Sequence, residues 1–333
     1  MESFRSDDNN VGKYVHNDGS ETAIKCVSSC DTILDPATGN FYNNNVDRQK
    51  YSIFISSSAG CFMKCKFCYL TIKNSKFLKL SGEQIEKNVL EALTEELKDN
   101  PSIKNRYVKL CWMGMGENSF IEPIKTQQTT IKLLEYISNN ASLGLDGVDI
   151  ATVFPLIPTD WINQFNILNK KLLEYPVNPN NVKSVHSSNS YKMEERSRLR
   201  LFYSLHSLLQ EERDFLIPNA QPLSIAIPEL EKFNEITGCN LIFHYMFMDG
   251  QNDSDKSVDA LLEFMQTRKQ HELRILRYNS CDYTPYHESP KFNSIIAKLS
   301  KEIPRIKVQI SVGTEMQAAC GQFIVKNWAE PST

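Results

Sequence analysis

Long apolar runs are missing from this sequence of 333 residues. No run reaches the roughly 18 to 20 residues that a membrane-spanning helix needs. The first twenty residues, MESFRSDDNNVGKYVHNDGS, also lack the basic and then apolar pattern of a secretory leader. We therefore expect a cytoplasmic protein with no membrane partner.

A strong net charge and an even number of cysteines are also absent. The net charge of −3 excludes nucleic-acid binding through bulk charge, although a local basic face remains compatible with it. The nine cysteines cannot all pair with one another, and without a secretory leader they favour metal ligation or catalysis over a disulfide framework. Hydrophobic residues make up 41% of the chain, enough for one large domain or two small ones.

The chain divides by composition into an amino-terminal segment, a long core and a tail. Residues 1–50 are rich in Asn, Asp, Ser and Gly and predict a weakly ordered extension or small cap. Residues 51–325 form the predicted core and residues 326–333 the tail. Within the core, residues 171–198 are polar and rich in Pro, Asn and Ser, which predicts a surface insertion.

The core alternates strand-like and helix-like segments, which predicts an α/β fold. Ser81 and Gln84 resemble a capping box that starts one helix, and Ser289 with Pro290 predicts the start of another. Such alternation implies a parallel sheet with helical crossovers, hence a partial or full barrel whose chemistry lies at the carboxyl ends of the strands. The predicted strands span residues 51–56, 108–112, 148–153, 199–205, 241–247, 272–278 and 306–312.

A short loop after the first predicted strand carries Cys61, Cys65 and Cys68 in a C-x3-C-x2-C spacing. Such a loop can wrap three thiolates around a four-iron cluster and leave one iron free for a substrate. Structural sites are normally closed by four ligands, and zinc motifs usually come as C-x2-C pairs. The alternatives are a zinc site completed by a distant ligand, or three buried thiols.

The ends of the next strands supply further candidate ligands. The second strand runs into LCWMGMGEN, where Gly114 and Gly116 allow close approach of a ligand and Glu117 offers a carboxylate to an ammonium group. Thr152, the run Ser204-Leu205-His206, and Asn279 follow later strands. Each is by itself more often a satisfied polar group than a ligand site. Together they mark the place where a barrel converges on one ligand.

The C-x3-C-x2-C loop with Phe67 before its last cysteine is the signature of the radical S-adenosylmethionine (SAM) superfamily, which this chain resembles. From about residue 51 to 323 it resembles the class A RNA methyltransferases of the RlmN/Cfr type, through SSSAGCFMKCKFC, MGMGE, YSLH, YMFMDGQND, ILRYN and MQAACGQF in that order. The resemblance implies a partial (β/α)6 barrel, a [4Fe-4S] cluster on Cys61, Cys65 and Cys68, and a SAM molecule cleaved to a 5′-deoxyadenosyl radical. The SAM contacts that it implies are Gly116, Glu117, Ser204, Leu205, His206 and Asn279, with Thr152 beside the position of a family serine, Ala151.

Cys320, in the rare ACGQ motif, looks like the family's methyl-carrying cysteine. The resemblance implies that its thiolate takes a methyl group from one SAM. A radical from a second SAM then activates that methyl for addition to an adenine carbon of RNA, joining enzyme and RNA covalently. The alternative is a buried structural cysteine. An electron donor such as flavodoxin or ferredoxin is a further implied partner.

Three departures from the family are visible. The position of the cysteine that releases the joined RNA holds Phe54, and the region of the catalytic glutamate, near Phe41, has no carboxylate. A counterpart of the family's helical RNA-binding domain is not found ahead of the core. Other residues that we consider for the missing roles, each more simply structural, are Cys26, Cys30, Cys111, Cys281, Asp35 and Asp47.

Three functions therefore remain in view. The first is methylation of an adenine in ribosomal or transfer RNA, with exposed lysines forming one edge of an RNA surface (Lys64, Lys66, Lys73, Lys76 and Lys79). The second keeps SAM cleavage but has another outcome or a non-RNA substrate. The third is a non-enzymatic protein with a structural metal site, against which the ordered SAM motifs argue.

Overall fold

The computed structural model describes residues 1–7, 9–26, 31–34, 41–43, 50–100, 107–140, 143–175, 198–280 and 284–309. Within these residues, twelve strands form one sheet, and the pair β7 (Ser58–Ala59) and β8 (Leu78–Lys79) forms a second, small one. The middle of the large sheet is parallel. Its strands, in spatial order, are β6 (Lys50–Phe54), β9 (Tyr107–Trp112), β10 (Gly144–Thr152), β11 (Leu199–Ser204), β12 (Asn240–Met246), β13 (Glu272–Leu276) and β14 (Ile306–Gln309).

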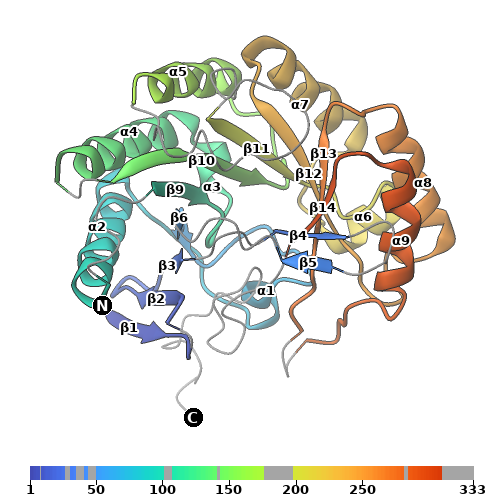
Figure 1. Cartoon of the computed structure of the whole chain (residues 1–333), viewed down its shortest axis with the longest axis horizontal. Coiled ribbons are helices and arrows are strands. Elements are labelled where there is room, and N and C mark those ends of the chain that lie inside the picture. Colours follow the sequence, from blue (N-terminus) through green and yellow to red (C-terminus); the bar gives the residue numbers. More distant parts are fainter. Residues whose placement is uncertain are drawn as a thin grey trace.

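The longer helices cover the outer face of the curved sheet, as the arc in Figure 1 shows, whereas the short α1 (Tyr69–Ile72) and α6 (Gln210–Leu216) lie inside that arc. The longer ones are α2 (Gly82–Asp99), α4 (Pro123–Asn140), α5 (Trp161–Leu173), α7 (Leu223–Thr237), α8 (Asp255–Gln266) and α9 (Phe292–Glu302); a third short one is α3 (Asn118–Ile121). Each of the seven predicted strands overlaps one of the parallel strands. The predicted α/β partial barrel is therefore confirmed.

The capping motifs predict the first residue of α2 correctly, but they place the first residue of α9 too early. Ser81 caps α2 as predicted, because its hydroxyl accepts from the Gln84 N–H while the Gln84 side chain accepts from the Ser81 N–H. α9 begins at Phe292, two residues later than Ser289 with Pro290 predicted, and Lys291 is its N-cap residue. The Ser289 hydroxyl instead accepts from the Lys291 N–H at 3.1 Å, so it stabilises the turn that precedes the helix.

The two faces of the sheet differ sharply in polarity. Leu110, Ile150 and Leu201 are buried in the main hydrophobic core between sheet and helices. Residues that alternate with them, Lys109, Asp149 and Arg200, therefore lie on the opposite, inner face. The Asp149 carboxylate pairs there with Lys109 at 3.3 Å and with Arg200 at 2.6 Å. The middle of the inner face is thus charged, whereas Met246 and Leu276 at its carboxyl end belong to a second, smaller apolar cluster.

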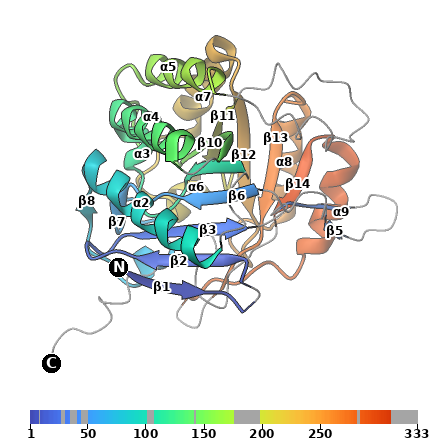
Figure 2. The same ribbon diagram turned by 60° about the vertical axis from the view of Figure 1, so that its left-hand side comes forward.

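The amino-terminal residues differ from the predicted weakly ordered segment, because they add strands to both edges of the parallel sheet. β1 (Glu2–Arg5), β2 (Val11–Val15) and β3 (Glu21–Cys26) continue it antiparallel beyond β6, as Figure 2 shows. β4 (Asp31–Leu34) and β5 (Phe41–Asn43) continue it beyond β14. An open parallel sheet leaves unpaired N–H and C=O groups at its edges, and these strands satisfy them. The composition of residues 1–50 contains no information about these unpaired backbone groups, so it could not predict the strands.

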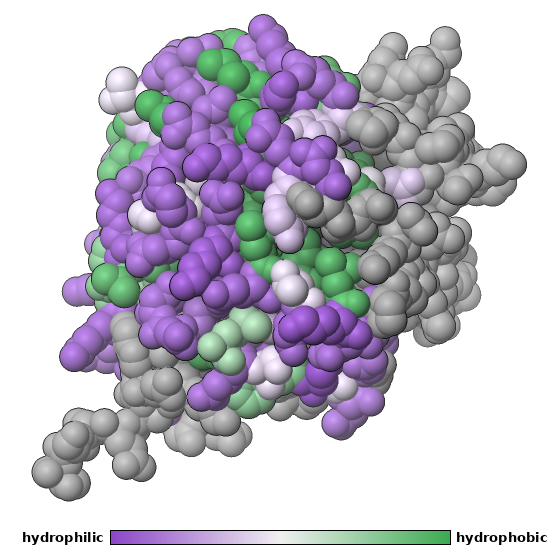
Figure 3. All heavy atoms as spheres, turned by 90° about the vertical axis from the view of Figure 1, so that its left-hand side faces the viewer, coloured by the Kyte–Doolittle hydropathy of each residue, from purple (hydrophilic) through white to green (hydrophobic). Residues whose placement is uncertain are grey.

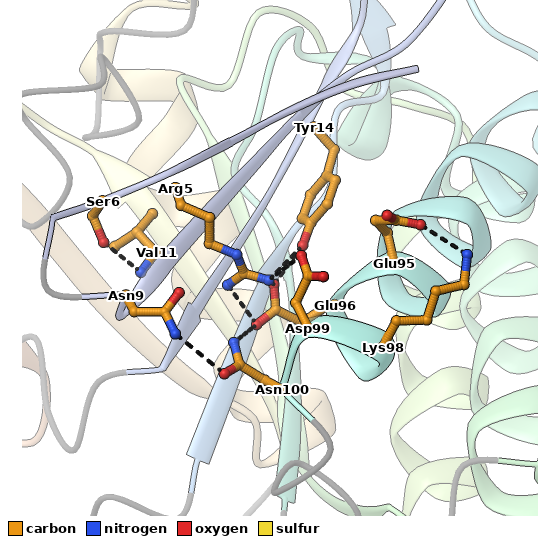
Figure 4. Close-up of polar contacts among 10 residues, drawn as sticks. All are labelled: Arg5, Ser6, Asn9, Val11, Tyr14, Glu95, Glu96, Lys98, Asp99 and Asn100. Atoms are coloured by element: carbon orange, nitrogen blue, oxygen red, sulfur yellow. Dashed lines mark hydrogen bonds and ion pairs between the residues drawn. The ribbon is translucent and has the colours of Figure 1, made fainter.

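Ion pairs fasten the β1–β2 hairpin to the end of α2 (Figure 4). The Arg5 guanidinium lies 2.7 Å from the Glu96 carboxylate and 3.3 Å from Asp99. The Tyr14 hydroxyl donates to the same Glu96 at 2.5 Å. A side chain at Gly12 would stand 2.6 Å from the Glu96 carboxylate, so the glycine is needed for this close approach. The amino-terminal hairpin is therefore part of the folded domain.

The predicted insertion begins later than residue 171, because α5 runs on to Leu173. At the far end, the Arg198 guanidinium donates to the carbonyls of Leu172 at 2.9 Å and Tyr175 at 2.5 Å, which holds the two ends of the segment together. The rest of the insertion, and the predicted tail at 326–333, lie outside the described residues.

The face that carries α2 and α4, on the left of Figure 1, is mostly hydrophilic, as Figure 3 shows. Among the residues that the structure describes, no helix has both the length and the apolarity to cross a bilayer.

Candidate active site

The loop with the three cysteines follows β6 and is held by contacts to distant parts of the chain. The Lys66 N–H donates to the carbonyl of Leu216 in α6 at 2.9 Å. The Asn219 side chain donates to the carbonyl of Phe62 at 3.1 Å, and the Tyr278 hydroxyl donates to that of Phe67 at 3.3 Å. The loop is therefore fixed between the ends of β11 and β13, at the carboxyl ends of the strands where the sequence placed it.

The three thiols lie close enough to influence one another. Cys65 is buried, while Cys61 and Cys68 are partly so. Burial, then the charge of Cys68, raises the pKa of Cys61 to about 12, whereas the N–H groups of Met63 and Gly116 act in the opposite direction. Burial raises the pKa of Cys65 well above its ordinary value, and Cys68 and Cys61 add to that effect. Three neighbouring thiolates thus need a cationic partner, which the irons of a cluster would supply.

No three His, Cys, Asp or Glu side chains among the described residues form a group that could hold a metal ion. That finding concerns a single ion. A four-iron cluster takes its cysteine ligands on separate irons. Around a single zinc ion, Zn–S bonds of about 2.3 Å in a tetrahedron place the cysteine sulfur atoms about 3.8 Å apart. The cysteine sulfur atoms that bind separate irons of a cluster stand farther apart than this. The loop therefore fits the cluster in ligand number, position and electrostatics.

The glycine-rich loop after β9 packs directly on the residues that precede the cysteines. The Gly114 N–H donates to the Ile55 carbonyl at 3.0 Å, and the Ser57 N–H donates to the Met115 carbonyl at 2.9 Å. Gly116 has a φ of +92°, and a side chain there would stand 1.9 Å from the Ser58 hydroxyl oxygen. These contacts explain why this loop needs its glycines and how it reaches the cysteine loop.

Glu117 ends that loop in a buried position. Its Oε1 accepts a hydrogen bond from the Thr152 hydroxyl and another from the Val153 N–H at 3.2 Å. Burial raises the pKa of the carboxyl to about 8, although both hydrogen bonds and the charge of Arg213 act to lower it. A buried carboxylate of this kind is stabilised by a cation, so the site favours a ligand with an ammonium group. The structure thus brings Thr152 and Glu117 together.

Ser204, Leu205 and His206 occupy the end of β11 and the bend after it. Leu205 is fully buried in the main core, so only its backbone can serve a ligand at the barrel mouth. His206 has a φ of 53°, is buried, and meets the Phe67 ring edge to face at 5.1 Å. Burial, assisted by the charge of Arg213, lowers the pKa of His206 to about 3, so the ring is neutral near pH 7. Its Nδ1 has no hydrogen-bond partner among the described residues.

Other predicted residues are placed less fully. Asn279 lies half-buried three residues beyond the end of β13. Phe54 packs against the same small apolar cluster as Cys61 and Cys68, and the Lys25 ammonium lies 4.8 Å from its ring centroid. Cys111 is buried and is the direct register partner of Phe54 in the neighbouring strand. The predictions for Cys320, Cys281, Cys30, Asp35 and Asp47 lie outside the described residues, and so does the Phe41 side chain.

Sequence reasoning missed two parts of this site. One is the Val153 N–H, a backbone group that no residue type reveals. The other is Arg213, which is 1% exposed although its segment, QEERDFL, has the composition of a solvated helix. The one available signal was its position seven residues after the end of YSLH.

The fold is similar to that of a solved radical SAM methyltransferase. The chain superposes on a radical SAM methyltransferase from Sphaerobacter thermophilus with a TM-score of 0.64 at 18% identity, covering 97% of this chain and 80% of that one. No family model matches the sequence.

In sequence the chain is similar to curated RNA methyltransferases. It is 24% identical over 312 residues to the "Dual-specificity RNA methyltransferase RlmN" of Campylobacter hominis, covering 92% of this chain and 77% of that protein. It is 23% identical over 279 residues to the "Probable dual-specificity RNA methyltransferase RlmN" of Prochlorococcus marinus strain NATL1A, covering 83% and 67%. These relatives and the solved structure are methyltransferases by name, so the predicted resemblance is confirmed.

Proposed function

We propose that the protein is a radical SAM enzyme that methylates an adenine in RNA through Cys320. The observation that carries the proposal is a set of hydrogen bonds between two segments of the proposed active site. The segment that leads into the cysteine loop and the loop that ends in Glu117 are hydrogen-bonded to each other at the carboxyl ends of the strands. A cluster-bound SAM needs both: thiolates on one side and a carboxylate for its ammonium group on the other.

The chain's own residues would bind and orient the cofactors. Cys61, Cys65 and Cys68 would hold the cluster, which supplies the electron that splits SAM when it is bound. Glu117, oriented by Thr152 and the Val153 N–H, would receive the SAM ammonium group. Further SAM contacts would come from Gly116, Ser204, the Leu205 backbone, His206 and Asn279.

The RNA substrate, ribosomal or transfer, is proposed from the names of the relatives. Four of the five lysines considered for an RNA surface are exposed: Lys64, Lys73, Lys76 and Lys79. Lys79 already pairs with Glu122 at 2.7 Å, and the Lys66 ammonium lies 3.7 Å from the Phe215 ring centroid. An electron donor such as flavodoxin or ferredoxin and a cytoplasmic location complete the proposal.

A second candidate function keeps SAM cleavage but changes the outcome or the substrate. Phe54 favours it, because an apolar ring in the place of the family's releasing cysteine cannot release a covalently joined RNA by thiol chemistry. Cys111, one strand away at the same register, is the described thiol placed nearest to that position in the sheet.

One experiment tests the cluster and SAM cleavage. Anaerobically reconstituted protein is expected to bind about four irons per chain and, with reductant and SAM, to release 5′-deoxyadenosine. Cys68→Ala should lose both properties. Cys239→Ala is the matched control, because Cys239 is a fully buried cysteine at the far end of α7 and should leave both unchanged. A colourless zinc protein would contradict the proposal.

A second experiment separates the two candidate functions. The reconstituted enzyme is incubated with SAM, reductant and total RNA, and the nucleosides are analysed by mass spectrometry. A methylated adenosine, together with a methyl group on Cys320 of the purified protein, supports methyl transfer to RNA. Cys320→Ala should abolish the product without changing the iron content. 5′-Deoxyadenosine release without a modified nucleoside supports the second function.

A further inference from the structure

Arg213 is a charged side chain in the interior of the protein, on the helix whose end contacts the cysteine loop. It extends from α6 and is 1% exposed. Its Nη1 donates to the carbonyls of Ser204, at 2.8 Å, and Leu205, and its Nη2 donates to the carbonyl of Val153 at 3.0 Å. Its Nε has no hydrogen-bond partner among the described residues. The guanidinium therefore joins the carboxyl ends of β10 and β11.

Carbonyl groups offer Arg213 hydrogen bonds but no opposite charge. In the part of the chain that the structure describes, no carboxylate lies within ion-pair distance of it. A buried guanidinium without a counter-charge is costly, and burial lowers the pKa of Arg213. The Tyr203 ring, whose centroid lies 4.9 Å from the guanidinium carbon, offsets part of that cost, and negative charge nearby would offset more.

Two groups of the proposed active site can bring that negative charge. The backbone of Val153 contacts both Arg213 and Glu117, because its N–H donates to the carboxylate while its carbonyl accepts from the guanidinium. Cys65 packs in one cluster with Leu216 and Ile217, which follow Arg213 by one helical turn. The charges of Cys65 and Glu117 both act on Arg213. The cation therefore faces the cysteine loop from one side and the SAM carboxylate site from the other.

We propose that Arg213 is a positioning residue that stabilises the reduced state of the iron–sulfur cluster, an inference that rests on the proposed function. Three thiolates give an oxidised four-iron cluster of core charge +2 a net charge of −1. One electron, taken from a flavodoxin, a ferredoxin or a chemical reductant, makes it −2. A fixed positive charge in a low-dielectric surrounding favours the more negative state, since net charge and nearby charges set cluster potentials.

A purely structural role would be to satisfy the three carbonyls, and substitutions can separate it from the role of the charge. Arg213→Lys keeps the charge, but one ammonium group cannot reproduce the planar fork that holds three carbonyls. Arg213→Gln removes the charge and keeps an N–H donor, and Arg213→Met removes both. Arg268→Gln is the matched control, because Arg268 lies after α8 and pairs with Glu231 at 2.7 Å.

The test is a redox titration of each reconstituted full-length protein, followed by electron paramagnetic resonance, with iron content measured on the same samples. We expect Arg213→Gln and Arg213→Met to lower the equilibrium constant for reduction at least tenfold, a shift of about 59 mV to more negative potential for one electron. Arg213→Lys should stay within threefold of the wild type, and Arg268→Gln should equal it. All variants at Arg213 should be less stable.

An unchanged potential in the charge-free variants, at normal iron content, would overturn the inference and leave Arg213 a structural residue. If neither charge-free variant retains iron, the lysine variant decides: a potential within threefold of the wild type supports the role of charge, and a tenfold loss overturns it. Failure of the wild type itself to bind iron would instead refute the proposed function.

Discussion

Gly116→Ala should disable the contact between the two loops of the proposed active site. Gly116 combines a φ of +92° with a position where a Cβ atom would stand 1.9 Å from the Ser58 hydroxyl oxygen. The backbone strain of an L-residue at positive φ costs about 1 kcal/mol. Relief of the clash should add about 1 to 3 kcal/mol, the usual range for overpacking. We therefore expect a loss of about 2 to 4 kcal/mol in the free energy of unfolding.

Gly238→Ala supplies the matched control, since Gly238 has a φ of +66° and nothing within 4 Å of an added Cβ. It should show the backbone cost alone, about 1 kcal/mol. The measurement is urea unfolding of the protein without cofactors, comparing midpoints at an unchanged slope. The reasoning would be refuted if Gly116→Ala lost no more stability than Gly238→Ala.

A double mutant identifies the clash itself. Ser58→Gly removes the nearest atoms, although it also removes a hydrogen bond from Ser58 to the Gly60 carbonyl at 2.8 Å, worth about 1 kcal/mol. In combination with Gly116→Ala, the loss should be smaller than the sum of the single losses by about 1 kcal/mol or more. Additive losses would mean that the Ser58 side chain is not the obstacle.

Further substitutions test the inner face and the amino-terminal hairpin. Asp149→Asn should lower the unfolding free energy by about 2 to 3 kcal/mol, because it leaves two cations without their counter-charge; Lys109 and Arg200, at 21% and 27% side-chain exposure, are partly relieved by water. Arg200 and Lys109 hold the pKa of Asp149 below its ordinary value despite burial, so its stabilisation is present above the unfolded pKa of about 4 and is lost as pH falls through the folded pKa. The stability difference between wild type and Asp149→Asn, measured by urea unfolding, should therefore shrink on acidification, and a constant difference would contradict the assignment. Tyr14→Phe should cost about 1 kcal/mol by removing the hydroxyl bonded to Glu96, and thermal unfolding should show no change if the hairpin is not docked on α2.

The candidate site could be predicted from the sequence where its residues lie in short motifs. Cys61, Cys65 and Cys68 share one loop. The glycines before Glu117 predict that the backbone of their loop approaches a neighbouring group closely. The seven parallel strands could also be predicted, since each is an apolar run with its own turn signals. The Ser81 capping box was readable for the same reason: capping involves residues only three positions apart.

Other features needed partners that are distant along the chain. The first fifty residues have the composition of a weakly ordered segment, yet five strands form there because the parallel sheet has two edges to satisfy. α5 continues into the predicted insertion because its last turn packs on the domain, as buried Leu172 shows. Neither fact depends on local composition.

The sequence alone predicts three cysteines in one loop, a glycine-rich loop before Glu117, and the order of strands and helices, because these follow from residue types at short spacing. The contact between Glu117 and Thr152 and the burial of Arg213 are visible in the folded chain alone. Burial and charge compensation depend on what the rest of the chain places around a side chain, and no window of sequence contains that information.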